Sequence, residues 1–134
     1  MPAAEASATS SVSAVWEGDL RCRVSAGSSE VMVDAAGNGD ESAGPSPTDY
    51  LLVSLASCYA TALAWEGRKR GIELPDLSVT ATGTYEGLRF GHLQLTVTTR
   101  LPADRLDRLL EPALRICYVS NTISGSTTID VTAT

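Results

Sequence analysis

The sequence is poor in the residues that mark metal sites. It contains one histidine and three cysteines among 134 residues. A zinc site needs about four Cys, His or acidic ligands, often in closely spaced pairs. The single histidine, His92, stands among residues typical of a strand. We therefore expect no metal site, and we interpret His92 as an ordinary strand position.

Positive charge and long apolar runs are also scarce. Ten Lys and Arg residues face sixteen Asp and Glu residues, giving a net charge of −6, and the basic residues form no stripe that could neutralise phosphates. No apolar run approaches the roughly 18 to 20 residues of a membrane span. The cysteines are few, odd in number and widely spaced, which favours a reducing compartment. We expect a cytoplasmic protein that binds neither nucleic acid nor membrane.

The chain is long enough for one well-packed domain. Residues 1–11 are rich in Ala and Ser without periodicity and are expected to form a flexible tail, which leaves a single domain over 12–134. Three short runs of strand-forming residues, separated by turn signals, predict a three-stranded meander over 12–16, 20–24 and 30–33. A small, polar loop follows at 35–44.

A strong helix signal begins at Ser46. Ser46 can cap the helix, Pro47 suits its first position, and Asp49 completes a pattern similar to a capping box. The following residues are apolar or small around nearly the whole circumference, and Gly71 can end the helix in a left-handed conformation. A helix of this kind needs more cover than one chain of this size offers, so we expect it to be central in a homodimer.

The C-terminal half predicts two strands, a helix and a last strand. Alternating residues predict strands over 77–85 and 92–100, and a helix begins near Pro102 and reaches Cys117. Pro112 is expected to kink or split that helix. The segment 127–132 predicts a final strand. The expected fold is α+β with the order βββ-α-ββ-α-β.

Two cysteines lie on apolar helical faces, Cys58 in the first helix and Cys117 at the end of the second. Since both faces must meet in the core, contact between Cys58 and Cys117 is sterically feasible. The alternative is that both are simply small buried hydrophobic residues. Cys22 lies between two arginines on a predicted strand and points away from both, so we expect it to face inward rather than take part in redox chemistry.

Two segments carry a resemblance to a known family. Residues 44–58 (GPSPTDYLLVSLASC) resemble the OsmC/Ohr signature, in which a proline-containing loop opens a long helix that carries a reactive cysteine. Residues 117–123 (CYVSNTI) resemble the second cysteine motif of the family, and 70–72 fits the end of the helix. The resemblance spans about residues 12–133 and keeps the same order of elements.

This resemblance implies a thiol-dependent peroxidase for organic or fatty-acid hydroperoxides, built as an intertwined homodimer and active in oxidative-stress defence. By the resemblance, Cys58 is the thiolate that attacks the peroxide and Cys117 resolves the resulting sulfenic acid as a disulfide. No metal, haem or flavin is implied. The implied reductant is a dithiol, such as a lipoyl-protein system.

The resemblance also indicates how the thiol is activated. In active members of the family an arginine from the N-terminal half, held by a glutamate directly after the helix-opening proline, stabilises the thiolate. Here that position is Thr48, followed by Asp49, and 35–44 contains no arginine. Arg21 and Arg23 are then the candidate cations, with Thr48 and Asp49 as candidate partners. The second hypothesis is an OsmC-like protein without fast peroxidase activity, which binds a small apolar ligand or performs slower thiol exchange.

Overall fold

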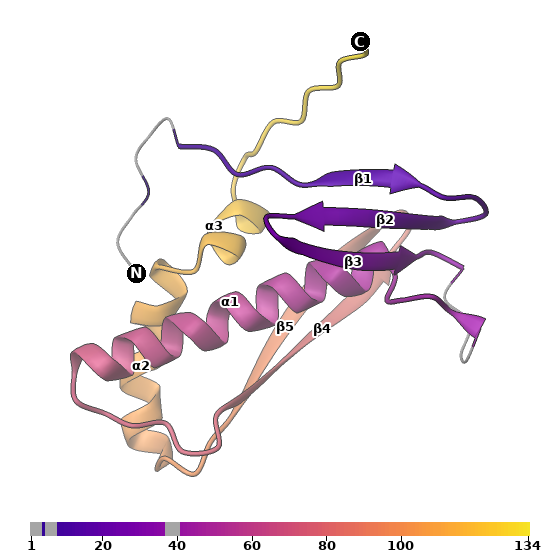
Figure 1. The fold of residues 1–134 in the computed structure, drawn as a ribbon. Helices are drawn as coiled ribbons and strands as arrows, with labels where there is room; N and C mark the ends of the chain where they lie inside the picture. Colours follow the sequence, from indigo (N-terminus) through magenta and orange to yellow (C-terminus); the bar gives the residue numbers. More distant parts are fainter. Residues whose placement is uncertain (1–3, 5–7, 37–40) are drawn as a thin grey trace. The chain divides into compact units, whose positions relative to one another are not determined.

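The computed structural model describes residues 4, 8–36 and 41–134. Figure 1 shows the elements of this part of the chain in the order β1 (Ser13–Trp16), β2 (Arg21–Ala26), β3 (Ser29–Asp34), α1 (Pro47–Lys69), β4 (Ser78–Glu86), β5 (Arg89–Thr98), α2 (Ala103–Arg115) and α3 (Tyr118–Ser124). The chain forms two compact units, one up to residue 51 and one from residue 52. The α+β class is therefore confirmed.

The N-terminal unit contains the predicted meander, with β1, β2 and β3 paired in antiparallel order. Along β2 the side chains alternate, so that Cys22 is half-buried while Arg21 and Arg23 are exposed. Cys22 stands opposite Val33 on β3 and Trp16 on β1, which places these three side chains on one face of the sheet. Cys22 therefore points away from Arg21 and Arg23, as predicted, and is half-buried.

Asp34 organises the chain after β3. Its carboxylate accepts hydrogen bonds from the N–H of Ala36 and the N–H of Ala43, each at 3.0 Å. These two hydrogen bonds lower the pKa of Asp34, because they favour the ionised carboxylate. The predicted loop over 35–44 lies between these contacts, and its residues 37–40, like residues 1–3 and 5–7 of the predicted tail, are outside the described part of the chain.

The start of α1 follows the prediction closely. The backbone N–H of Asp49 donates to Ser46 Oγ at 3.1 Å, and the N–H of Ser46 donates to Asp49 Oδ2 at 3.2 Å, which closes a reciprocal capping box. One turn on, the Tyr50 hydroxyl donates to the carbonyl oxygen of Met32 at 2.9 Å and ties this end of the helix to β3.

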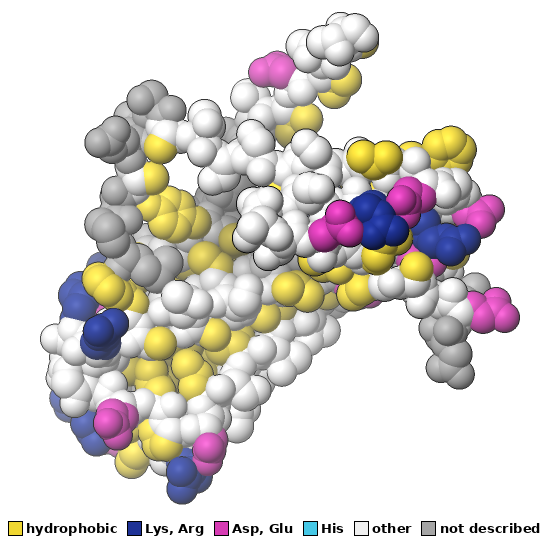
Figure 2. Space-filling model, viewed as in Figure 1, with side chains coloured by type: hydrophobic (Ala, Val, Ile, Leu, Met, Phe, Trp, Pro, Cys, Tyr) yellow, Lys and Arg dark blue, Asp and Glu magenta, His cyan; other side chains and the backbone are white. Residues whose placement is uncertain are grey.

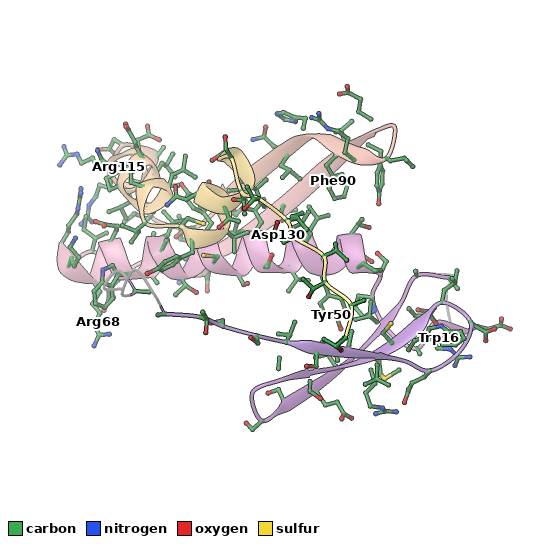
Figure 3. The ribbon with its side chains drawn as sticks, turned by 90° about the horizontal axis from the view of Figure 1, so that it is seen from above. Trp16, Tyr50, Arg68, Phe90, Arg115 and Asp130 are labelled. Carbon is green, nitrogen blue, oxygen red and sulfur yellow. The ribbon has the colours of Figure 1, made fainter. Side chains whose placement is uncertain are left out.

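In the second unit, β4 and β5 form an antiparallel hairpin with a bulge. The register pairs Tyr85 with Phe90 but Thr84 with His92, so Gly91 is the extra residue. The rings of Tyr85 and Phe90 lie 4.6 Å apart, and Phe90 also covers Gly83, where a Cβ would come within 2.6 Å of the ring. Phe90 lies near the turn of the hairpin in Figure 3. The predicted strand over 92–100 thus begins earlier, at Arg89.

The core of this unit lies where α1 meets α2 and the hairpin (Figure 1). Leu63 of α1 and Leu109 of α2 are fully buried, and the hairpin contributes half-buried side chains such as Val79, Leu95 and Val97. The alternation of apolar and Thr side chains along β4 and β5 explains why the hairpin has one face against the helices. This packing fixes the middle of α1 against the C-terminal half of α2.

The end of α1 is set by two glycines. Gly71 has a φ of +66°, and Ile72 N–H donates back to the Gly67 carbonyl at 2.8 Å, as in a Schellman motif. A Cβ on Gly67 would lie 2.6 Å from the Ile72 carbonyl oxygen, so only glycine fits there. The predicted left-handed position of Gly71 is confirmed.

Pro112 does not split α2 at its own position, contrary to one of the two predicted outcomes, and the kink stays a prediction. The helix continues to Arg115, and a separate helix, α3, begins at Tyr118. Pro112 has no N–H to offer the Arg108 carbonyl one turn earlier. That carbonyl instead accepts a hydrogen bond from the Arg70 guanidinium at 3.1 Å. An outside donor thus satisfies the group that Pro112 leaves free, and the helix tolerates the proline.

One further expectation is wrong, and another stays a prediction. Residues 127–132 form no strand, because they pair with no other strand among the described residues. Within the single chain, helix α1 is buried on one face, and hydrophobic side chains remain visible along it in Figure 2, so its cover by a second subunit stays a prediction. Its uncovered face is formed by residues spaced three or four apart: Val53, Ser57, Thr61 and Ala64.

Candidate functional site

Cys58 lies in the middle of α1 and is half-buried against the core. It follows Leu55 by one turn and immediately precedes Tyr59, and both neighbours are buried. The apolar spacing that predicted the helix therefore also places the thiol beside the core rather than in open solvent.

Cys117 occupies the break between α2 and α3 and is fully buried. The sequence placed it at the end of one long helix. The structure instead has it directly before α3, with an extended backbone (φ −82°, ψ 103°). The carbonyl of Cys117 accepts the first hydrogen bond of α3, from the N–H of Asn121 at 3.0 Å. The Asn121 side chain donates to the Arg115 carbonyl at 3.1 Å and so holds the two helix ends together.

The structure brings the two cysteines together. Cys58 packs against the core that contains Cys117, the two thiols are close enough to influence each other's ionisation, and neither is in a disulfide. The contact joins α1 to the junction of α2 and α3. Tyr59 strengthens the same junction, because its hydroxyl donates to the Leu110 carbonyl of α2 at 2.7 Å.

The surroundings of Cys117 favour its protonated form. Burial raises the pKa of the Cys117 thiol, and the neighbouring Cys58 acts in the same direction. The N–H groups of Ser120 and Val119 act in the opposite direction, although no regular capping hydrogen bond is formed. Burial also raises the pKa of Tyr59, with a smaller contribution from Cys117. Cys117 is thus suited to give up a proton late in a reaction rather than to begin as a thiolate.

Two cavities of this unit are lined in part by residues that lie near the cysteines in the chain. One, of about 280 Å³, is lined by Tyr59, Leu95 and Leu114, among others. The other, of about 460 Å³, is reached one turn along each helix from the cysteines, at Leu55 and Ser120. Both volumes are near or within the range of about 300–1,000 Å³ common for small-molecule sites.

The candidate activating residues all have local partners in the N-terminal unit. Arg21 pairs with Asp19 at 3.0 Å. Arg23 is exposed and bridges two carboxylates, Glu17 at 3.0 Å and Glu30 at 2.7 Å, which raise the pKa of its guanidinium. Asp49 is used in the capping box, and the Thr48 hydroxyl lies 3.2 Å from that of Ser46. Their role in activating a thiol remains a prediction.

Sequence reasoning missed several residues around the cysteines. Tyr59 stands next to Cys58, but nothing in the sequence indicated that its hydroxyl would reach α2. Arg89 lines the larger cavity together with His92. The prediction that His92 is a strand residue is confirmed. Arg89 could have been found from its spacing, because a residue three positions before His92 lies on the same short strand.

Within the described ranges, no three His, Cys, Asp or Glu side chains come together as ligands for a metal ion. None of the helices in this part of the chain is both long and apolar enough to cross a membrane. The α+β fold and the paired thiols at a helix junction define a protein with a potential dithiol site.

Comparison with known proteins identifies the family. A family model described as OsmC-like protein matches residues 37–132. The chain therefore belongs to the OsmC-like protein family, as the sequence motifs predicted. No curated protein matches the sequence significantly.

Solved structures share the fold at low sequence identity. An OsmC-like protein from Mycoplasma pneumoniae has a TM-score of 0.75 and 18% identity, covering 89% of each chain. The organic hydroperoxide resistance protein OsmC from Legionella pneumophila has a TM-score of 0.64 and 22% identity, covering 90% of this chain and 93% of its own. The organic hydroperoxide resistance protein OhrB of Bacillus subtilis has a TM-score of 0.60 and 19% identity, covering 87% of this chain and 91% of its own.

Proposed function

We propose that the protein is a thiol-dependent peroxidase that reduces organic hydroperoxides through Cys58 and Cys117. The observation that carries this proposal is that two reduced thiols from separate elements are neighbours in one core. Neighbouring cysteines can form a disulfide where their Cα atoms lie within about 7 Å, whereas distant cysteines cannot. Family membership supports the same chemistry, because two similar structures are named for organic hydroperoxide resistance.

The reaction follows from the different surroundings of the two thiols. The Cys58 thiolate attacks the distal peroxide oxygen, the O–O bond breaks, and the alkoxide leaves and takes up a proton as the alcohol. Cys58 becomes a sulfenic acid. The Cys117 sulfur then displaces the hydroxyl, which leaves as water with the Cys117 proton, and a disulfide forms. A dithiol reductant, such as a lipoyl-protein, returns two electrons and two protons.

The proposed roles differ because the burial of the two thiols differs. Cys58 is half-buried and is the thiol that a hydroperoxide can approach. Cys117 is fully buried, and burial raises the pKa of its thiol. A protonated, shielded thiol is protected from direct oxidation and still supplies the proton that the leaving hydroxyl needs. This division agrees with the roles implied by the sequence motifs.

The test is mass spectrometry before and after one equivalent of cumene hydroperoxide. The expected product within seconds to a minute is a Cys58–Cys117 disulfide, which is absent in Cys58→Ser. In Cys117→Ser the Cys58 sulfenic acid should accumulate and be trapped by dimedone. Cys22→Ser is the matched control and should behave like the wild type. Thiols that stay reduced for many minutes in the wild type would contradict the proposal.

The second candidate function is binding of a small apolar ligand or slow thiol exchange. It is favoured by the pairing of Arg21 and Arg23 with carboxylates, because a neutralised guanidinium activates a thiolate poorly. Under this alternative the disulfide would form over hours with hydroperoxide. An oxidised dithiol such as lipoamide would react no slower than cumene hydroperoxide.

We further propose that the working unit is a homodimer in the cytoplasm. The uncovered face of α1 supports the dimer: Val53 is 53% exposed there, and the Ser57 and Thr61 hydroxyls are turned back onto carbonyls of their own helix. The two hydroxyls therefore need no hydrogen-bond acceptor from a second subunit that covers this face. Light scattering should give the mass of two chains, and Val53→Glu should shift the protein toward monomer. A wild-type monomer at micromolar concentration would contradict the dimer.

A further inference from the structure

Two helix junctions lie between the two thiols, and they are built differently. The first joins α1 to α2, where Leu63 and Leu109 are fully buried in the shared core. The Tyr59 hydroxyl adds a hydrogen bond of 2.7 Å to the Leu110 carbonyl of α2. Because Tyr59 directly follows Cys58 in the chain, this junction fixes the Cys58 end of the thiol pair against α2.

The second junction, between α2 and α3, lacks such packing. None of the described residues 118–124 of α3 is buried. Cys117 lies at this junction, and its N–H donates to the Leu114 carbonyl at 3.2 Å, which is a turn contact rather than an α-helical one. A turn with few buried neighbours opens at low cost. The position of Cys117 relative to Cys58 therefore depends on the contacts that hold α3 to α2.

Asn121 bonds the chain on both sides of this junction. Its side-chain amide donates at 3.1 Å to the carbonyl of Arg115, which lies in the last turn of α2 and is labelled in Figure 3. Its backbone N–H donates at 3.0 Å to the Cys117 carbonyl. The side chain of Asn121 is exposed, so replacing it leaves the buried core intact. Asn121 can thus be changed without removing packing around either cysteine.

We propose that Asn121 is a positioning residue for the thiol pair, whose side chain keeps Cys117 within reach of Cys58 while the disulfide forms. In that step the Cys117 sulfur attacks the sulfur of the Cys58 sulfenic acid. The S–O bond breaks, the S–S bond forms, and the hydroxyl leaves as water with the Cys117 proton. A disulfide has a length of about 2 Å and a narrow range of dihedral angles. A junction that opens therefore lowers the fraction of chains ready to react.

The speed of closure also decides how well Cys58 is protected. Cys58 is half-buried, so its sulfenic acid stays open to a second hydroperoxide molecule until Cys117 reacts. That second molecule transfers one oxygen, becomes an alcohol and leaves Cys58 as a sulfinic acid, which the dithiol reductant does not restore. By holding Cys117 in place, Asn121 favours the disulfide over this irreversible product.

The kinetic test measures consumption of cumene hydroperoxide and closure of the disulfide separately, the second by acid quenching and mass spectrometry. Asn121→Ala should consume the first equivalent at the wild-type rate and close the disulfide about fivefold more slowly, because one net hydrogen bond is lost. Dimedone should then trap more Cys58 sulfenic acid, and excess hydroperoxide should give more sulfinic acid. Asn121→Gln keeps an amide donor and should recover part of the closure rate.

Thr122→Ala is the matched control. The Thr122 hydroxyl donates to the Tyr118 carbonyl at 2.8 Å, so this variant removes one side-chain hydrogen bond within α3 and none to α2. It should close the disulfide at the wild-type rate. Closure in Asn121→Ala as fast as in the wild type would overturn the proposal. Equal slowing in Asn121→Ala and Thr122→Ala would overturn it too, because general loosening of α3 would then explain both.

The closure step rests on the proposed peroxidase function, but the reduction potential of the cysteine pair does not. In dithiothreitol redox buffers the Cys58–Cys117 disulfide exchanges with the dithiol without any peroxide. The same fivefold change should make the potential of Asn121→Ala about 20 mV less negative than that of the wild type. If the protein is no peroxidase, cumene hydroperoxide leaves the wild-type thiols reduced, yet this shift remains. If only the role of Asn121 is wrong, the wild type still reacts, and both proteins share one closure rate and one potential.

Discussion

The hydrogen bond between the Arg70 guanidinium and the Arg108 carbonyl explains how α2 accommodates Pro112, and this explanation can be measured. In Arg70→Ala the Arg108 carbonyl loses its donor, because Pro112 supplies no N–H. The buried carboxylate of Glu66 also loses an ion pair of 3.6 Å and keeps Lys69 at 3.4 Å. The variant should therefore be less stable, and the loss should depend on Pro112.

The expected size follows from these two contacts. A net intramolecular hydrogen bond contributes about 1 kcal/mol, and a partly exposed ion pair contributes about 0.5 kcal/mol. Arg70→Ala should thus lower the free energy of unfolding by about 1.5 kcal/mol. In Pro112→Ala the new N–H of residue 112 can donate to the Arg108 carbonyl within the helix. In that background, Arg70→Ala should remove only the ion pair with Glu66 and lower the free energy of unfolding by about 0.5 kcal/mol.

Urea denaturation of the wild type, both single variants and the double variant gives the coupling energy. We expect a coupling of about 1 kcal/mol between positions 70 and 112. Arg105→Ala, which removes an exposed arginine of the same helix, serves as the control and should show no coupling with Pro112. A coupling near zero for Arg70 would mean that the helix tolerates the proline for another reason, and the argument would be refuted.

Three further predictions concern other parts of the chain. Backbone hydrogen bonds lower the pKa of Asp34 below its ordinary value of 3.8, so the ionised Asp34 contributes its full stability above about pH 4 and loses it as the pH falls through the lowered pKa. The pH midpoint of acid unfolding should therefore rise in Asp34→Asn. An unchanged midpoint would contradict this prediction. Because burial raises the pKa of the Cys117 thiol, iodoacetamide at pH 8 should alkylate Cys117 far more slowly in the native protein than in urea, as followed by peptide mass spectrometry. Leu63 is fully buried, so Leu63→Ala should lower the free energy of unfolding by about 3 kcal/mol. Leu88→Ala in the fully exposed hairpin turn should change it by less than about 0.5 kcal/mol, and similar losses at both positions would contradict the packing argument.

Local rules in the sequence were enough for most of the elements. Alternation predicted the meander and the hairpin, and the pattern from Ser46 to Asp49 predicted the capping box, because these features depend on residues close together in the chain. The family was predicted from two cysteine motifs and is confirmed. The motifs also pointed to the pair of Cys58 and Cys117.

The contacts that depend on distant residues could not be read in the same way. The segment 127–132 alternates like a strand, but an alternating segment forms a strand only where another strand offers it hydrogen bonds. Pro112 looked like a helix breaker until the fold brought Arg70 to the freed carbonyl. Local sequence patterns determined most of the helices and strands, but not the break between α2 and α3 or the absence of a strand over 127–132. Only the tertiary structure decided that Cys58 and Cys117 become neighbours, because α1 and the junction of α2 and α3 meet only when the core packs.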